Sequence, residues 1–276
     1  MKPKTVLLTG ATGFVGRQIL ETLTEQFAKM RLVVREGKHS QLELSDKIES
    51  IWASSDIFLE TPDWWKKACE GIDTVIHAAW YAEPGKYLQS PKNIDCLSGT
   101  LKLSQACVQA GVRRFVGIGT CFEYDLTQGY LSIDTPLKPT TPYAAAKAAT
   151  FITLSQYLAV SGVEFVWCRL FYLYGKGENE RRLVPYLRKR LSQGKIAELT
   201  SGNQVRDFLD VQVAGRLIAE IAQGKKQGPV NVCSGQPITI RQLAEQIADE
   251  YGRRDLLCFG VRPDNIVDPP CVVGVR

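Results

Sequence analysis

The sequence predicts an α/β protein whose parallel sheet is covered by helices on both faces. Up to about Tyr172, short apolar segments alternate with longer segments of helical character. The apolar segments are hydrophobic on both faces, which is typical of strands buried between two layers. The repeated order of strand, helix and strand favours a doubly wound parallel sheet. With 276 residues, the chain is long enough for one large or two modest domains.

The first elements follow one another closely. A strand is expected at 4–10, where an apolar run ends in glycine, and a helix over 14–28 comes after it. A second strand is expected at 31–35. An irregular region then leads to a helix at 64–71 and a strand at 73–79. This order builds the first strand–helix–strand units of the sheet.

The later elements continue the alternation and then lose it. Four are regular: a helix at 96–110, a strand at 113–120, a helix at 142–161 and a strand at 163–169. Beyond about Tyr172 the pattern loosens. The segments 205–211 and 228–235 are expected to return to the main body, and the stretches between and after them to form a smaller second lobe.

Composition and charge exclude several classes of function. Hydrophobic residues make up 45% and charged residues 23%, and no apolar run is long enough for a membrane span. The N-terminus does not resemble a signal peptide. The net charge of +5 without basic tracts suits phosphate-bearing small molecules better than nucleic acid.

Cysteine and histidine usage points to a cytoplasmic protein without a metal centre. The eight cysteines are scattered and form no CxxC pair, so we expect reduced thiols. His39 and His77 are the two histidines, which leaves little material for a metal site or a histidine-based triad.

A glycine-rich turn, TGATGFVG, lies between the first strand and the first helix. Its glycines are Gly10, Gly13 and Gly16. Such a turn lets backbone amides approach a pyrophosphate, which then lies at the positive end of the helix. Because a strand precedes the turn and a helix follows it, the pattern indicates a Rossmann-type dinucleotide site.

A tyrosine and a lysine occur four residues apart in PTTPYAAAK. The Thr-Pro pair at 141–142 suits an N-cap and a first helical position, so Tyr143 and Lys147 share one helix face. A second such pair at 172–176 lies among glycines and is not in a helix. From the spacing alone, Tyr143 and Lys147 are either an ordinary helix pair or a proton donor and the cation that tunes it.

Several motifs occur together in a fixed order. They are TGATGFVG at 9–16, Asp56-Ile57, HAAW at 77–80, NIDCLSGT at 93–100, GTCFEY at 119–124, PYAAAK at 142–147, RLFYLYG at 169–175, RDFLDV at 206–211 and NVCSG at 231–235. This set resembles the extended short-chain dehydrogenase/reductase (SDR) family, in its branch of nucleotide-sugar epimerases, dehydratases and 4-ketoreductases. The resemblance covers nearly the whole chain and favours the catalytic interpretation of PYAAAK.

The resemblance also implies a division of the chain. It implies a dinucleotide-binding Rossmann domain over 1–172 plus roughly 207–232. A smaller α/β C-terminal substrate-binding lobe would comprise roughly 173–206 and 233–276. Homodimers are usual in the family, so a homodimer is expected.

The resemblance assigns roles in catalysis to three residues. Tyr143 would be the acid/base, and Lys147 would tune it and hold the nicotinamide ribose. A tyrosine has a pKa near ~10, which a nearby ammonium and a cationic nicotinamide would lower. Thr120, four residues before Tyr124, would hydrogen-bond the reacting oxygen of the substrate.

The remaining site residues are also implied by the resemblance. The cofactor residues are Gly10, Gly13, Phe14 and Val15 at the pyrophosphate, Asp56 and Ile57 at the adenine, and Ala78 and Ala79 along the cofactor. Asn93 would lie beside the sugar or cofactor, with packing as the alternative. Arg206 would grip the diphosphate of the substrate, because a guanidinium suits a dianion, and a solvated surface arginine is the alternative.

The end of the second strand departs from an NAD-preferring site. Such sites carry an acidic residue there, whereas a 2′-phosphate calls for arginine. This chain has Arg35 at that position and Lys38 close by, which favours NADP(H), with NAD(H) possible. Glu36 is a counter-signal, because it would face the ribose if the strand ended one residue later.

A second departure concerns the reaction. The 4,6-dehydratases of the family carry an acidic pair where this chain has Cys121 and Phe122, and Glu123 is one step further on. Dehydration is therefore not expected. An NADP(H)-dependent 4-ketoreductase of a nucleotide-linked 4-keto-6-deoxy sugar is favoured over an NAD-dependent 4-epimerase by Arg35. More distant alternatives are a non-catalytic NADP-binding sensor and a reductase of a non-sugar ketone.

Overall fold

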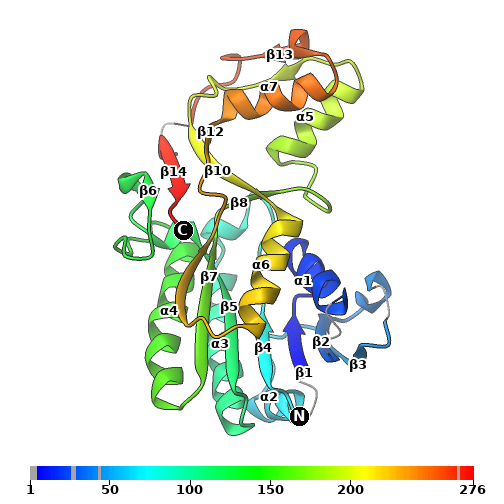
Figure 1. The fold of residues 1–276 in the computed structure, drawn as a ribbon, viewed down its shortest axis with the longest axis vertical. Helices are drawn as coiled ribbons and strands as arrows, with labels where there is room; N and C mark the ends of the chain where they lie inside the picture. Colours follow the sequence, from blue (N-terminus) through cyan, green and yellow to red (C-terminus); the bar gives the residue numbers. More distant parts are fainter. Residues whose placement is uncertain (1–4, 26–28, 43–44, 266–267) are drawn as a thin grey trace.

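A seven-stranded parallel sheet forms the centre of the molecule (Figure 1). The computed structural model describes residues 5–25, 29–42, 45–265 and 268–276. The strand order is β11-β7-β5-β4-β1-β2-β3. The strands are β1 (Thr5–Thr9), β2 (Lys29–Arg35), β3 (Ile48–Ser54), β4 (Thr74–His77), β5 (Arg114–Thr120), β7 (Glu164–Leu170) and β11 (Gly228–Val232). The order reverses between β1 and β4, which confirms the doubly wound fold.

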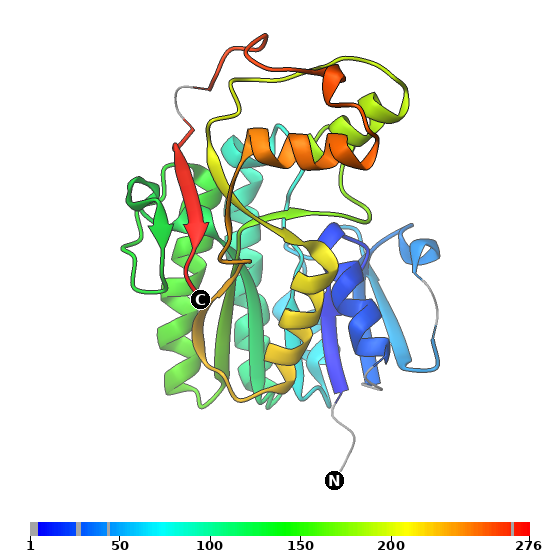
Figure 2. The same ribbon diagram turned by 45° about the horizontal axis from the view of Figure 1, so that its top comes forward.

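Helices cover both faces of this sheet (Figure 2). One face packs against α1 (Phe14–Glu25) and α6 (Val211–Gln223). The other packs against α2 (Pro62–Cys69), α3 (Lys92–Gln109) and α4 (Pro142–Val160). The strands are therefore buried on both sides, which explains their continuous apolar runs.

The helix that carries the tyrosine–lysine pair begins and ends where its sequence predicts. The Thr141 hydroxyl accepts the Ala144 N–H at 3.2 Å, and Pro142 occupies the first turn. The helix ends at Val160, and Gly162 follows with φ of +72°. In the first helix, the part of the prediction over 26–28 lies outside the described residues, as does the start of the first strand at residue 4.

Strand β3 lies in the region that was expected to be irregular. Most of its residues are only half-buried, and Glu49 and Ser50 interrupt its apolar residues. As an edge strand paired only with β2 among the described strands, it lacks the continuous apolar run that marks the inner strands. Its pattern therefore gave no clear signal.

A second sheet lies beside the first and contains five strands. They are β6 (Tyr130–Leu131), β8 (Tyr172–Tyr174), β10 (Val205–Asp210), β12 (Pro237–Thr239) and β14 (Cys271–Gly274). The segment 205–211, expected to return to the main body, forms β10, which pairs with β8, β12 and β14 and leads into α6 on the central sheet. The main-sheet position next to β7 is occupied by β11, as expected for 228–235.

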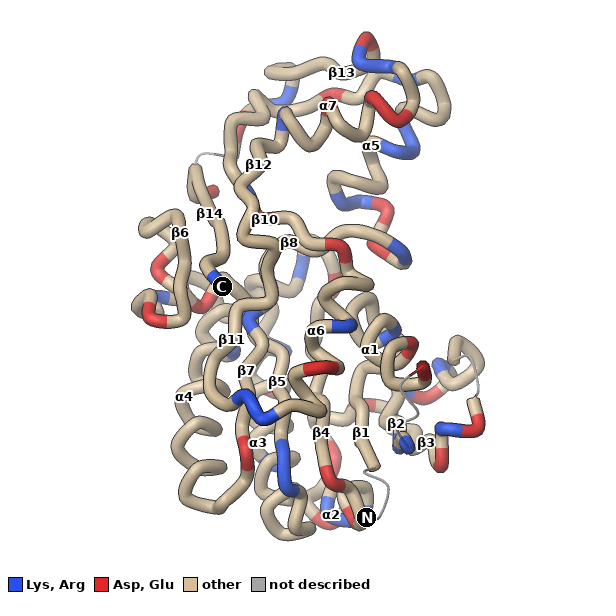
Figure 3. The backbone as a smooth tube through the Cα atoms, viewed as in Figure 1, with Lys and Arg blue, Asp and Glu red and all other residues tan. Residues whose placement is uncertain are grey.

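A lobe of two helices covers the carboxyl ends of the central strands (Figure 1). Helices α5 (Leu183–Ser192) and α7 (Ile240–Glu250) share a separate apolar cluster, next to the short strands β9 (Ala197–Glu198) and β13 (Leu257–Cys258). Charged residues are frequent on this lobe and sparse along the central strands (Figure 3). Every helix in the described ranges is too short or too polar to cross a bilayer.

Candidate active site

A cleft of about 1050 Å³ opens at the carboxyl ends of the central strands. It lies where the strand order reverses, which is where open α/β sheets bind their ligands. Its lining includes most of the residues expected at a site, namely Gly10, Gly13, Phe14, Val15, Arg35, Lys38, Asp56, Ile57, Ala78, Ala79, Thr120, Tyr143 and Lys147. Asn93 and Arg206 are not among the residues that line it.

The glycine loop forms one wall of the cleft. Gly10 has φ of +74°, and a Cβ there would lie 2.7 Å from the Ala79 nitrogen. A Cβ on Gly16 would collide with the Gly10 carbonyl oxygen. Helix α1 begins at Phe14, and the residues of its first turn line the cleft, where helix N-termini offer unpaired amides. Only glycines allow this close approach of loop, helix and β4.

A buried histidine fixes the end of β4 beside this loop. The Thr100 hydroxyl donates to the Cys96 carbonyl, so it accepts from Nε2 of His77 at 3.0 Å. The Nδ1 of His77 then accepts from the Thr9 hydroxyl at 2.9 Å, and that hydroxyl accepts the Ala79 N–H. Burial lowers the pKa of His77 to about 3, so the ring is neutral at physiological pH.

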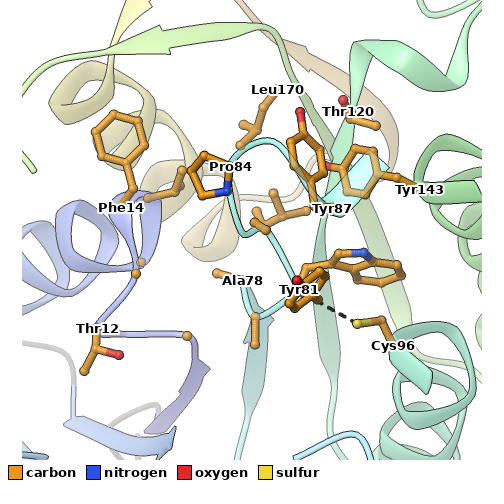
Figure 4. Close-up of a pocket in the computed structure, with 18 of the residues that line it drawn as sticks. Thr12, Phe14, Ala78, Tyr81, Pro84, Tyr87, Cys96, Thr120, Tyr143 and Leu170 are labelled. Atoms are coloured by element: carbon orange, nitrogen blue, oxygen red, sulfur yellow. Dashed lines mark hydrogen bonds between the residues drawn. The ribbon is translucent and has the colours of Figure 1, made fainter. Parts of the chain in front are cut away.

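Thr120, Tyr143 and Lys147 converge on the cleft from two elements. Thr120 ends β5, Tyr143 lies in the first turn of α4, and Lys147 lies one turn later. Figure 4 shows the side chains of Thr120 and Tyr143 close together on one side of the cleft, next to Tyr87. The Lys147 ammonium donates to the Ile118 carbonyl oxygen at 2.6 Å, and the residue is only 3% exposed.

The protonation of the tyrosine and the lysine is governed by burial. Burial raises the pKa of Tyr143 well above its ordinary value, although hydrogen bonding with Thr120 opposes this. Burial lowers the pKa of Lys147 to about 7, while the negative charge of Glu123 raises it. The sequence led us to expect a lowered phenol pKa, but removal of the phenolate from water raises it here.

Thr120 is held in place by a buried carboxylate that points away from the cleft. Glu123, which is fully buried, accepts the Thr120 backbone N–H at 2.8 Å. It also accepts from Trp167 Nε1 at 2.9 Å and from Arg169 Nε at 2.8 Å. A Cβ on Gly119 would collide with the Trp167 indole, so glycine in β5 makes this arrangement possible.

This carboxylate belongs to a longer chain of hydrogen bonds. Arg169 Nη1 donates to the Tyr124 hydroxyl at 2.9 Å, and that hydroxyl donates to Asn231 Oδ1 at 2.7 Å. The Asn231 amide donates to the carbonyls of Leu131 and Val275. The part of the cleft around Thr120 is thereby connected to β11, β6 and the segment after β14.

Aromatic residues surround the tyrosine and lysine, and the sequence did not single them out. The Lys147 Nζ lies 3.7 Å from the centroid of the Trp80 ring. The Tyr87 ring meets the Tyr143 ring edge to face at 4.8 Å between centroids. Asn93 is fully buried and accepts from Trp80 Nε1 at 2.9 Å, so the structure places it behind the cleft wall. The only sequence signal for Trp80 was its place in the HAAW motif.

The opposite end of the cleft carries the two basic residues expected near a ribose. Arg35 is the last residue of β2, and both Arg35 and Lys38 line the cleft. Glu36 is not among the lining residues, and its backbone N–H donates to the Ser54 carbonyl. Asp56 lines the same end of the cleft, and its carboxylate accepts a hydrogen bond from the Phe58 backbone N–H at 3.0 Å.

Arg206 lines a smaller neighbouring pocket of about 300 Å³. This pocket shares Tyr172 and Arg182 with the main cleft. Arg206 is 4% exposed, and its guanidinium carbon lies 5.3 Å from the Tyr172 ring centroid. In the part of the chain that the structure describes, no group of three or more His, Cys, Asp or Glu side chains is arranged to hold a metal ion.

Comparison with known proteins gives a family and a fold. Residues 6–233 match the model of the NAD dependent epimerase/dehydratase family. The chain is 23% identical to the dTDP-6-deoxy-L-talose 4-dehydrogenase (NAD(+)) of Aggregatibacter actinomycetemcomitans, over 98% of this chain and 99% of that protein. It is 28% identical to the GDP-6-deoxy-D-mannose reductase of Pseudomonas aeruginosa, over 88% of this chain and 79% of that protein.

Solved structures share the architecture. The UDP-N-acetylglucosamine 4-epimerase of Methanobrevibacter ruminantium M1, in complex with UDP-N-acetylmuramic acid, superposes with a TM-score of 0.87 at 23% identity. That match covers 100% of this chain and 90% of the epimerase. The UDP-glucose 4-epimerase of Thermotoga maritima has a TM-score of 0.82 at 18% identity, over 98% and 89% of the two chains.

Proposed function

The chain belongs to the NAD dependent epimerase/dehydratase family, a family of extended SDR enzymes, and from this membership we propose that it is an NADP(H)-dependent 4-ketoreductase. Its substrate is a nucleotide-linked 4-keto-6-deoxy sugar. The observation that carries the proposal is the composition of the cleft, which has Thr120, Tyr143 and Lys147 at one end and Arg35 and Lys38 at the other.

The cleft fits a nicotinamide dinucleotide. At the glycine loop a side chain on Gly10 or Gly16 would meet backbone atoms, so the loop offers bare amides to a pyrophosphate. Asp56 and Ile57 would hold the adenine, and Ala78 and Ala79 would border the cofactor. When bound, the cofactor supplies or takes up a hydride. The relatives and family are named for nucleotide-sugar substrates and NAD, which supports this class of chemistry.

The side chains at the reaction end suit reduction of a carbonyl. Because burial raises the pKa of Tyr143, its phenol is protonated at neutral pH and can donate a proton to a carbonyl oxygen. The Thr120 hydroxyl accepts the Phe122 N–H at 3.3 Å, which leaves its own proton for the same oxygen. Lys147 would orient the ribose and offset the charge that Tyr143 gains when it releases the proton.

Two features favour a reductase over the other reactions of the family. Cys121 and Phe122 follow Thr120, and burial raises the pKa of Cys121, so neither supplies an acid/base for dehydration. Arg35 and Lys38 line the cleft and Glu36 does not, which suits a 2′-phosphate. NADP(H) is the exchangeable cofactor of reductases, whereas a 4-epimerase keeps its NAD.

The wall around the reaction end favours a deoxygenated sugar. Phe122 and Tyr172 meet edge to face at 6.2 Å between centroids, and both line the cleft. Such a surface suits a methyl group better than a hydroxymethyl group. The adjoining pocket with Arg206 and Arg182 would receive the diphosphate and nucleotide.

The direct test is consumption of NADPH with a panel of nucleotide-linked 4-keto-6-deoxy sugars. We expect turnover with one member of the panel. If the purified protein consumes no NADPH but releases NAD when denatured, the 4-epimerase assignment replaces the reductase. If it binds NADPH and turns over no sugar or other ketone, a non-catalytic binding role replaces both.

The cofactor preference has its own test. Arg35→Ala should raise the KM for NADPH by about 10-fold to 100-fold, which is typical of a lost hydrogen bond to a charged group. The KM for NADH should change little. The neighbouring Glu36→Gln should leave NADPH binding unchanged. If Glu36→Gln loses affinity for NADH and Arg35→Ala keeps its affinity for NADPH, the site is built for NAD. The name of the related dTDP-6-deoxy-L-talose 4-dehydrogenase (NAD(+)) carries that cofactor.

A further inference from the structure

The Lys147 ammonium is a buried charge with few polar contacts. The residue is 3% exposed, and its ammonium donates a hydrogen bond to the Ile118 carbonyl at 2.6 Å. Within the described part of the chain, Lys147 forms no ion pair with a carboxylate. A buried cation is unfavourable unless another group compensates for the lost water.

Besides the Ile118 carbonyl, the face of the Trp80 indole lies close to the ammonium. Its centroid lies 3.7 Å from the Lys147 Nζ. The indole of Trp167 lies further away, with its centroid 5.7 Å from Nζ. Indole has the most favourable ring face for a cation, and the attraction is strongest where water is excluded. Trp80 therefore occupies the position that a counter-ion would otherwise take.

The orientation of Trp80 is fixed by a fully buried amide. Trp80 Nε1 donates to Asn93 Oδ1 at 2.9 Å. The Asn93 amide nitrogen in turn donates to the carbonyls of Tyr87 at 2.7 Å and Ser90 at 2.9 Å. Both ends of the Asn93 side chain are thereby satisfied, and the indole has little freedom to rotate away from the lysine.

Other titratable groups face Lys147 from the surrounding elements, and Glu123 raises its pKa through its charge, but in the described residues none of them forms a hydrogen bond or ion pair with the ammonium. Glu123 from the turn after β5 is already engaged by Arg169. His77 from β4 is neutral, because burial lowers its pKa to about 3. Cys96 from α3 is also neutral, because burial raises its pKa to about 11. The fourth group, Tyr143 on the same helix, stays protonated for the same reason.

We propose that Trp80 is a positioning residue that keeps Lys147 protonated and aimed into the cleft, and that Asn93 is the anchor that fixes Trp80. The inference rests on the proposed function in that it takes Lys147 as the lysine of the reaction. It adds a role for Trp80 and reassigns Asn93 from ligand contact to support of the lysine.

The test measures the pKa of Lys147 itself and needs no substrate. The protein is labelled with a trace of acetic anhydride across a range of pH, and the Lys147 peptide is quantified by mass spectrometry. Trp80→Leu should lower the pKa of Lys147 by about one unit, which is the size of a desolvated cation–π contact. Trp80→Phe keeps a ring face and should cause less than half of that shift.

A matched control and a second variant separate this role from general packing. Trp52→Leu removes a half-buried indole that packs on Trp64, is not among the cleft-lining residues, and should leave the Lys147 pKa unchanged. Asn93→Ala should shift the pKa in the same direction as Trp80→Leu by a smaller amount. If Trp80→Leu leaves the Lys147 pKa unchanged or raises it, or if Leu and Phe shift it equally, the proposal is wrong.

The same variants distinguish this proposal from the proposed function. If no sugar is reduced by any form of the protein but the pKa shifts appear, Trp80 positions the lysine and the reductase assignment alone fails. If the wild type reduces a sugar, the alkaline limb of kcat/KM should move to lower pH in Trp80→Leu. An unmoved limb together with an unmoved pKa excludes the role of Trp80 and leaves the reductase intact.

Discussion

One end of the cleft is formed mainly by backbone atoms and the other mainly by side chains. At the proposed cofactor end the backbone forms the wall of the cleft, and Gly10 and Gly16 matter because a side chain there would meet backbone atoms. At the reaction end buried side chains dominate, with Trp80 against Lys147 and Glu123 behind Thr120. The cofactor end should therefore be sensitive to added volume. The reaction end should be sensitive to lost charge, hydrogen bonds and ring faces.

The largest effect is expected when one oxygen is removed from the reaction end. Tyr143→Phe keeps the ring that packs on Tyr87 but removes the proposed proton donor. We expect kcat/KM to fall about 10³-fold, the usual contribution of a general acid, while the affinity for NADPH stays the same. Tyr157→Phe, on the same helix and away from the cleft lining, should retain full activity. Comparable losses in both variants would contradict the assignment.

The second largest effect is expected at the buried carboxylate of Glu123, next to the end of β5. Glu123→Gln leaves the Arg169 guanidinium buried without its partner, so the free energy of unfolding should fall by about 3 kcal/mol. Because Glu123 also holds the Thr120 N–H, kcat should fall more than the NADPH affinity does. Urea unfolding and steady-state kinetics measure the two effects. Asp249→Asn, which breaks the exposed pair with Arg254, should change neither quantity.

At the cofactor end, a single methyl group should be enough to disrupt binding. Gly10→Ala puts a Cβ against the Ala79 nitrogen at a positive φ, so we expect a loss of about 2 kcal/mol in unfolding free energy and of NADPH binding. Gly111→Ala has nearly the same φ of +72° but open space around it. It should lose only about 1 kcal/mol and retain NADPH binding. If both variants lose the same stability and bind NADPH equally well, the close backbone contact at Gly10 is not important for cofactor binding.

The smallest expected effect on function concerns His77, the buried last residue of β4. Its pKa of about 3 in the folded protein lies below the value of 6.5 expected when unfolded. The unfolded chain therefore binds the proton more readily, and stability falls as the pH drops from about 6.5 toward 3. Between pH 7 and pH 5 this amounts to about 2 kcal/mol. His77→Gln should lack this share of the acid sensitivity, which urea unfolding at the two pH values will show.

The features that the sequence predicted are those set by residues close together in the sequence. The glycine loop and the helix from Pro142 depend on neighbouring residues, so their geometry follows from the short motifs themselves. The same motifs bring Thr120, Tyr143 and Lys147 to one cleft. The direction of the Tyr143 pKa was not predictable in this way, because it depends on enclosure by residues from several elements.

Contacts between distant segments account for what the sequence missed. Nothing local to Asn93 shows that its amide binds Trp80, and nothing local to Glu123 shows that Arg169 is its partner. The edge strand β3 and the pairing of β10 in a second sheet also depend on which neighbours are already occupied. Such features follow from the assembled structure and not from residue pattern.

The hydrogen-bond chain from Thr120 to Asn231 has a consequence for the order of synthesis. Asn231 ends this series of hydrogen bonds by donating to the carbonyls of Leu131 and Val275. Val275 lies more than a hundred residues beyond Thr120 in the sequence. A ribosome adds roughly 5–20 residues per second, and the earlier strands can pair as they emerge. The glycine loop can therefore form early, and the Glu123 support behind Thr120 can form once Arg169 has been made. The far end of the hydrogen-bond chain stays open until residues 231–275 have been made. A nascent chain stalled before that point should acquire the dinucleotide end of the cleft first.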